Sequence, residues 1–134
     1  MILGIDPGSA RVGVAIADLE TRFARPVEVI DVKERDPVER VVQLVSELAV
    51  ERVVVGRPVH LSGASGAAVE AAAELVSGLR EALDVPVVEW DERLTTVVAE
   101  QGLRAGGAHV RARRALRDAV AAQVMLQGYL DAQR

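Results

Sequence analysis

The sequence has no cysteine, very few aromatic residues and a single lysine, Lys33. Without cysteine there can be no disulfide framework, no thiolate metal site and no cysteine nucleophile. Aromatic residues make up only 2% of the chain, so the core must be built from Val, Leu, Ile and Ala. No apolar run approaches the ~20 residues that span a bilayer, so we expect no membrane segment. No basic segment precedes the apolar first residues, so we expect no secretory signal and a cytoplasmic location.

Excess positive charge is also lacking, since the formal net charge is −4. That balance argues against a protein that coats nucleic acid through bulk electrostatics alone. The bases are unevenly distributed, however. Five arginines crowd one stretch, whereas the acids are spread along the whole chain; the five are Arg104, Arg111, Arg113, Arg114 and Arg117. This stretch is either a basic flap over a substrate or a solvated loop.

At 134 residues the chain is long enough for one domain, which we place at residues 1–134. Residues 1–5 and 12–17 are apolar runs separated by Asp6, Pro7 and Gly8, which predicts an opening hairpin. An alternating run at residues 26–30 adds a third strand, and short connections predict that the three strands are antiparallel.

Helices and buried strands then alternate along the rest of the chain. Asp36 and Pro37 are typical of an N-cap and a first helical position, and residues 52–56 form a continuously apolar strand. A long helix follows the loop at 56–66, with a predicted buried stripe of Val69, Ala72, Ala73, Val76, Leu79 and Leu83. Residues 84–90 are a fifth strand, Thr95 or Thr96 caps a third helix, and the last helix covers about 112–131. The pattern predicts an α/β fold: a five-stranded mixed sheet (three antiparallel strands then two parallel) with helices on both faces.

Acidic residues stand where two of these strands end. Asp6 follows the first strand, and Asp91 and Glu92 follow the fifth. Because ligands bind beyond the carboxyl ends of parallel strands, we expect these acids to share a crevice. The alternative for Asp6 is a turn residue that accepts hydrogen bonds from its own loop.

A third carboxylate, Asp118, interrupts the apolar stripe of the last helix. The stripe comprises Ala115, Asp118, Ala119, Ala122, Met125, Leu126 and Tyr129. An acid in such a line is paired, binds a metal or lies at the rim of the core, because burying an unpaired charge is costly. The alternative to a metal ligand is a rim residue paired with Arg114 or Arg117.

Three converging carboxylates stay ionised only if cations neutralise them, and their hard oxygen atoms suit Mg²⁺ or Mn²⁺. Two such ions about 4 Å apart form the clamp that cleaves phosphodiesters. The residues therefore favour a divalent-metal-dependent nuclease that holds two ions.

Four segments resemble one known family in order and spacing. They are residues 4–8 (Gly-Ile-Asp-Pro-Gly), 55–58 (Val-Gly-Arg-Pro), 91–96 (Asp-Glu-Arg-Leu-Thr-Thr) and 118–122 (Asp-Ala-Val-Ala-Ala). The chain thereby resembles the YqgF/RuvX family over essentially its whole length. That resemblance implies an RNase H-like fold, and a nuclease that either resolves Holliday junctions or matures small-subunit ribosomal RNA.

Carried over residue by residue, the resemblance implies that Asp6, Glu92 and Asp118 are the catalytic, metal-binding acids. Neighbouring side chains of an extended strand point to opposite faces, so only one of Asp91 and Glu92 can join them. We favour Glu92 for its longer reach. The chain departs from the family's pattern in the loop after Gly56, where it has Arg57, Pro58 and His60, and this departure concerns substrate contacts only.

Several arginines are candidates for binding substrate phosphates bidentately. They are Arg11, Arg57 and Arg93, which stand near strand ends, and Arg113 and Arg114 in the basic stretch. Trp90 beside the acids either stacks on a base or simply packs in the core.

Two other functions remain open: a non-catalytic RNA- or ribosome-binding module, and a nucleotide-binding fragment like those of sugar kinases and actin. The sequence does not distinguish junction DNA from ribosomal RNA precursor as the substrate. Junction resolution needs two active sites across a two-fold axis, so a homodimer is implied for that substrate alone.

Overall fold

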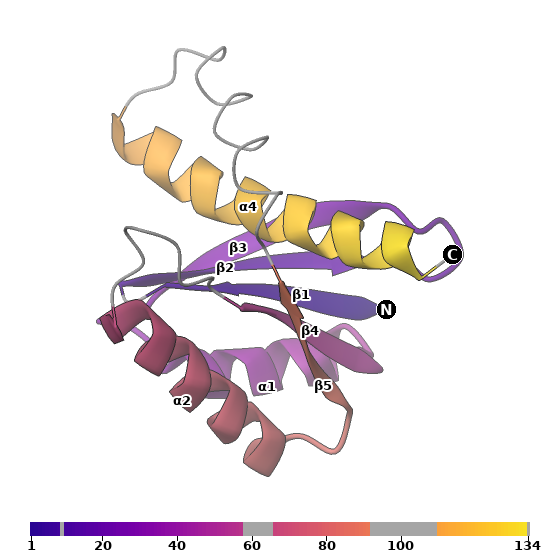
Figure 1. Ribbon diagram of the computed structural model, residues 1–134, viewed down its shortest axis with the longest axis horizontal. Helices are drawn as coiled ribbons and strands as arrows, with labels where there is room; N and C mark the ends of the chain where they lie inside the picture. The colour runs from indigo at the N-terminus through magenta and orange to yellow at the C-terminus, as the bar shows by residue number, and fades with distance from the viewer. Residues whose placement is uncertain (9, 58–65, 92–109, 134) are drawn as a thin grey trace.

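Five strands and three helices make up the part of the chain that the computed structural model describes (Figure 1). Described are residues 1–8, 10–57, 66–91 and 110–133, with the backbone alone for 110–117. The elements are β1 (Ile2–Pro7), β2 (Arg11–Ala17), β3 (Ala24–Asp31), α1 (Pro37–Glu47), β4 (Arg52–Arg57), α2 (Gly66–Ala82), β5 (Val87–Asp91) and α4 (Val110–Ala132). The third helix predicted from Thr95 or Thr96 lies outside the described residues.

The strands form one sheet in the order β3-β2-β1-β4-β5. β1 and β2 pair antiparallel, as do β2 and β3, whereas β1–β4 and β4–β5 are parallel. The predicted mixed sheet is therefore confirmed, and the carboxyl ends of β1, β4 and β5 lie at the same edge. β3 is longer at both ends than the predicted 26–30.

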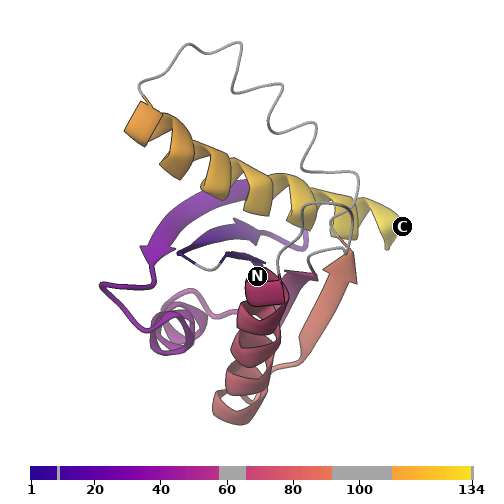
Figure 2. The ribbon, with the colours of Figure 1, turned by 60° about the vertical axis from the view of Figure 1, so that its left-hand side comes forward.

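Alternation along β1 and β2 divides the core between the two faces of the sheet. Leu3 and Ile5 of β1 pack on one face with α1 and α2, while Ile2 packs on the other with α4. Figure 2 shows α4 lying across one face, with α1 and α2 against the opposite one. This two-sided cover follows the prediction from the apolar strands.

Each helix buries one stripe, and α1 begins where the sequence provides a cap. The Asp36 side chain accepts a hydrogen bond from the Val38 backbone N–H at 3.1 Å, and Pro37 is the first helical residue of α1. In α2 the prediction that Ala73 belongs to the buried stripe is wrong, because Ala73 is exposed and Leu75 is buried instead. Within the described ranges no helix is both long and apolar enough to cross a membrane.

The turn between β2 and β3 is fastened to α4 by two glutamines. Gln127 accepts a hydrogen bond from the Ala24 N–H (2.9 Å) and donates one to the Arg22 carbonyl (2.9 Å). Gln123 donates to the Ala24 carbonyl at 3.0 Å. Because these bonds join residues about a hundred positions apart, they set how α4 lies along the sheet.

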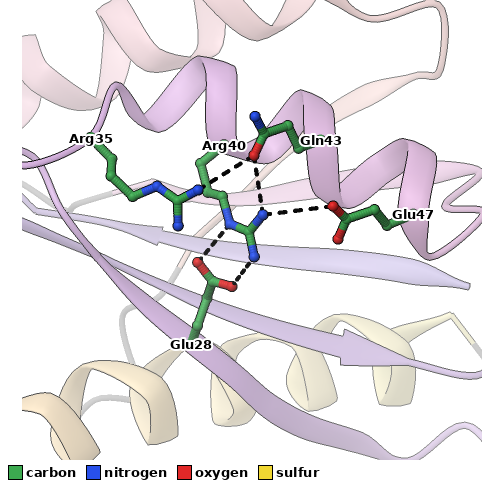
Figure 3. Close-up of polar contacts among 5 residues, drawn as sticks. All are labelled: Glu28, Arg35, Arg40, Gln43 and Glu47. Carbon is green, nitrogen blue, oxygen red and sulfur yellow. Dashed lines mark hydrogen bonds and ion pairs between the residues drawn. The ribbon is translucent and has the colours of Figure 1, made fainter.

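On the other face, an ion-pair network joins α1 to β3 (Figure 3). Arg40 donates through Nε and Nη2 to the two carboxylate oxygens of Glu28, at 2.9 and 2.7 Å. Arg40 also contacts Gln43 and Glu47. The side chains of Arg40 and Glu28 are only 17% and 24% exposed, so solvent screens this pair less than a surface pair. The hydrogen bond from Arg40 lowers the pKa of Glu28.

We predict that Glu28→Gln lowers the free energy of unfolding by about 1–2 kcal/mol at pH 7, because a charge-assisted bidentate contact is lost. The pKa of Glu28 is lowered from its ordinary 4.5 in the folded state. Its contribution is therefore complete above about pH 4.5 and is lost as the pH falls through the lower folded-state pKa. Urea unfolding of both proteins from pH 7 to pH 3 should show their difference shrinking with acidity.

Glu34→Gln is the matched control, since Glu34 is exposed just before the same helix. Its unfolding free energy should stay within about 0.5 kcal/mol of the parent at pH 7. Equal losses in the two variants, or a Glu28→Gln difference that grows as the pH falls, would contradict this account of the network.

Candidate active site

Asp6 is the last but one residue of β1, at the edge of the sheet where the parallel strands end. Ile2 and Gly4 of the same strand face α4, since Ile2 belongs to the core beneath that helix and Gly4 lies against Leu126. The two-residue period of a strand places Asp6 on the same face. Its side chain is partly buried, and its register partner on β2 is Gly13.

The backbone of α4 approaches β2 closely at Gly13. A Cβ built on Gly13 would overlap the backbone carbonyl of Asp118. The helix backbone can rest on β2 only because residue 13 has no side chain. The backbones of Asp118 and Asp6 therefore lie beside the same glycine, although the two residues are 112 positions apart.

Asp118 lies at the rim of the core and forms an ion pair with a residue of another element. Arg11, at the start of β2, places Nε 2.8 Å from Oδ2 of Asp118. The two side chains are 38% and 27% exposed. The contact is an ion pair rather than a well-aligned hydrogen bond, because neither atom meets hydrogen-bond geometry. Attraction between opposite charges at this distance does not need an aligned N–H.

Asp91 and Glu92 were predicted to be alternatives for the third acid. Val88 and Trp90 of β5 pack with the core beneath α4, whereas Glu89 lines a cleft with residues of α2. Alternation then assigns Asp91, which is exposed, to the α2 face, opposite Asp6. Glu92 lies outside the described residues. Among the described residues no group of three potential metal ligands is present.

The predicted phosphate-binding arginines have different surroundings. Arg11 lies on the α4 face with the two acids. Arg57 is exposed at the end of β4, in register with Asp91. Arg113 and Arg114 belong to the beginning of α4, where only the backbone is described, and Arg93 lies outside the described residues.

Trp90 packs on α4. Its ring meets that of Tyr129 edge to face, with centroids 5.5 Å apart and an interplanar angle of 87°. The Tyr129 hydroxyl in turn accepts a hydrogen bond from Arg52 at 2.9 Å. These contacts favour the interpretation of Trp90 as a packed residue that holds the end of β5 against the helix.

Asp6, Asp118 and Arg11 together have the chemistry that suits a cation site with a positively charged side chain beside it. Asp6 and Asp118 supply carboxylate oxygens, which are the ligands that Mg²⁺ and Mn²⁺ prefer. Both side chains are only partly buried, so an ion and a phosphate can reach them. The donor set fits a divalent cation, and the nearby guanidinium of Arg11 suits a phosphate. Sequence reasoning identified these side chains but missed Gly13, for which an isolated glycine within an apolar strand was the available signal.

Comparison with known proteins places the whole chain in a family context. The family described as "RuvX: Holliday junction resolvase" matches residues 1–132. A protein of Chloroflexus aggregans named "Putative pre-16S rRNA nuclease" is 42% identical over 134 residues, which cover 99% of this chain and 94% of that protein. A Thermobifida fusca protein with the same name is 44% identical over 142 residues, covering 98% and 87%.

Solved structures share the fold at low sequence identity. The structure described as "T. thermophilus RuvC in complex with Holliday junction substrate" superposes with a TM-score of 0.62 at 20% identity, covering 98% of this chain and 94% of that one. A fowlpox virus resolvase bound to Holliday junction DNA gives 0.59 at 9% identity, covering 98% and 97%. At these identities the likeness establishes the fold, which is the predicted RNase H-like one.

We predict that Gly13→Ala destabilises the protein by about 2 kcal/mol or more, because the added methyl group must push α4 off the sheet. Urea unfolding measures the loss. Gly66→Ala is the control, since a Cβ there meets nothing within 4 Å, and it should be neutral or stabilising by up to about 1 kcal/mol. A Gly13→Ala protein as stable as the parent would show that α4 does not rest on β2 in this way.

Proposed function

The chain belongs to the RuvX family of nucleases, and we propose that Asp6, Asp118 and Glu92 hold its catalytic metal ions. The observation that carries the proposal is that the backbones of Asp6 and Asp118 lie beside Gly13, on the α4 face of the edge where the parallel strands end. Alternation along β5 supports Glu92 over Asp91, because Asp91 falls on the opposite face.

Mg²⁺ or Mn²⁺ is the proposed cofactor, with two ions sharing the three acids. RNase H-like nucleases are typically metal-dependent. Bound there, the metal would activate water and stabilise the leaving oxygen of a phosphodiester. The residues of the chain have simpler tasks. Asp6 and Asp118, held by a strand and a helix, keep carboxylate oxygens in fixed places. The proposed phosphate-binding residues, which orient the backbone of the nucleic acid, are Arg11, Arg57, Arg93, Arg113 and Arg114.

We propose the precursor of small-subunit ribosomal RNA as the substrate. Relatives named "Putative pre-16S rRNA nuclease" share 39–44% identity with the chain over nearly its full length. The structural likeness to the two resolvases in complex with junction DNA is at 20% and 9% identity and supports the fold alone. Trimming an RNA needs one active site, so this substrate requires no homodimer.

Junction DNA is the second candidate, favoured by the description of the matching family as a Holliday junction resolvase. It would require a homodimer with two active sites related by a two-fold axis. The matching family and the relatives named above are described as a resolvase and as nucleases, not as nucleotide-binding proteins. A non-catalytic RNA-binding module remains as one outcome of the test that follows.

We predict that Asp6→Asn, Asp118→Asn and Glu92→Gln each reduce cleavage by at least about 100-fold, because a neutral side chain is a poor metal ligand. Asp91→Asn is the matched control and should retain most of the activity. The measurement is cleavage of precursor RNA, a four-way junction and single-stranded DNA, each with Mg²⁺ and with Mn²⁺. Circular dichroism checks that every variant folds.

Three outcomes would contradict parts of this proposal. Loss of activity in Asp91→Asn with retention in Glu92→Gln would exchange the roles of the two neighbours. Cleavage of the four-way junction but not of the precursor RNA would show that junction DNA, rather than the RNA, is the substrate. Tight RNA binding with no metal-dependent cleavage of any substrate would favour the non-catalytic module.

A further inference from the structure

We propose that Arg11 and the metal ion compete for Asp118, and that metal binding frees Arg11 to bind the phosphate of the substrate. The inference rests on the proposed function in one respect, which is that Asp118 is a metal ligand. It adds an order of events: the ion binds first, and a phosphate-binding group becomes available as a result.

The contact that carries the inference is the ion pair between the side chains of Arg11 and Asp118 at the rim of the site. Nε of Arg11 lies 2.8 Å from Oδ2 of Asp118, and both atoms are buried within side chains that are otherwise partly exposed. The backbone of Arg11 is held in β2 by pairing with Asp31 of β3. Its side chain, 38% exposed, can therefore turn toward solvent without any movement of the sheet.

A metal ion and the guanidinium of Arg11 repel each other when both contact Oδ2 of Asp118. A small divalent ion binds carboxylate oxygen at about 2.0–2.1 Å. An ion on Oδ2 would therefore stand within about 5 Å of the Arg11 nitrogen, with two like charges in a partly buried corner. The guanidinium must move away, and a phosphate that approaches the same ion offers it a group of opposite charge. Arginine suits this exchange because its planar fork binds carboxylate and phosphate equally well.

This exchange predicts that loss of Arg11 changes two quantities in opposite directions: the metal affinity and the enhancement of nucleic-acid binding by the metal. Removing Arg11 takes away the competitor, so the metal should bind more tightly. The same change removes a phosphate-binding group that the metal had released, so the metal should enhance nucleic-acid binding less. A residue that merely supports the fold near Asp118 would weaken both kinds of binding when it is lost.

The experiment measures Mn²⁺ affinity of the full chain by calorimetry for the parent, Arg11→Gln, Arg11→Lys and Arg25→Gln. Arg25 pairs with Ile16 near the far end of β2, so its loss changes the net charge equally without touching Asp118. We expect Arg11→Gln to bind Mn²⁺ about fivefold more tightly, the size expected for a partly exposed ion pair. Arg11→Lys and Arg25→Gln should stay within about twofold of the parent.

A second arm measures binding of a fluorescent single-stranded RNA with and without Ca²⁺, which replaces the catalytic ion so that cleavage does not interfere. Ca²⁺ should tighten RNA binding to the parent by more than it does for Arg11→Gln. Urea unfolding of each variant confirms that the binding changes do not come from loss of the fold.

The two possible failures are distinguishable. If the parent binds no Mn²⁺, the metal site itself is wrong, and this inference falls with it. If the parent binds Mn²⁺ and Arg11→Gln binds it equally or more weakly, only the competition is wrong. If Ca²⁺ enhances RNA binding equally in the parent and in Arg11→Gln, then metal binding does not free Arg11 to bind a phosphate, and that part of the proposal is wrong.

Discussion

The arrangement of the candidate site depends on the direct contact between the backbone of α4 and β2 at Gly13. A helix normally stands off a sheet by the thickness of two layers of side chains. At Gly13 one of those layers is missing, and the carbonyl of Asp118 occupies the space. Further along, Gly4 admits Leu126 in the same way, where a Cβ would lie 2.8 Å from that of the leucine. Two glycines on neighbouring strands thus allow α4 to sit deep on the sheet.

Other contacts keep the helix in that position. Hydrogen bonds that Gln123 and Gln127 donate and accept fasten α4 to the chain at the start of β3. The packing of Trp90 on Tyr129 joins α4 to β5. The two ends of the sheet are therefore tied to one helix. Because the acids of the site come from a central strand and from this helix, their relative position is as rigid as the packing between the two layers.

Much of the fold could be predicted from the sequence because its signals are local. The alternation of apolar runs and turns located the strands, and the pair Asp36 and Pro37 located the start of α1. The stripe of α4 was also correct for the described residues from Ala119 to Tyr129. In α2, by contrast, alanines crowd several sides of the helix and do not define one stripe, so Ala73 was assigned to the buried side in place of Leu75.

The sequence by itself determined which residues are the candidates for the chemistry: carboxylates at a strand end and within an apolar helical stripe, with arginines nearby. Only the tertiary structure decided which of them meet. Arg11 forms an ion pair with Asp118 because β2 passes beneath α4, and spacing along the last helix gives no sign of this contact. The reason is physical: spacing along one element reports only neighbours on that element, whereas a contact between residues 11 and 118 depends on how two layers pack.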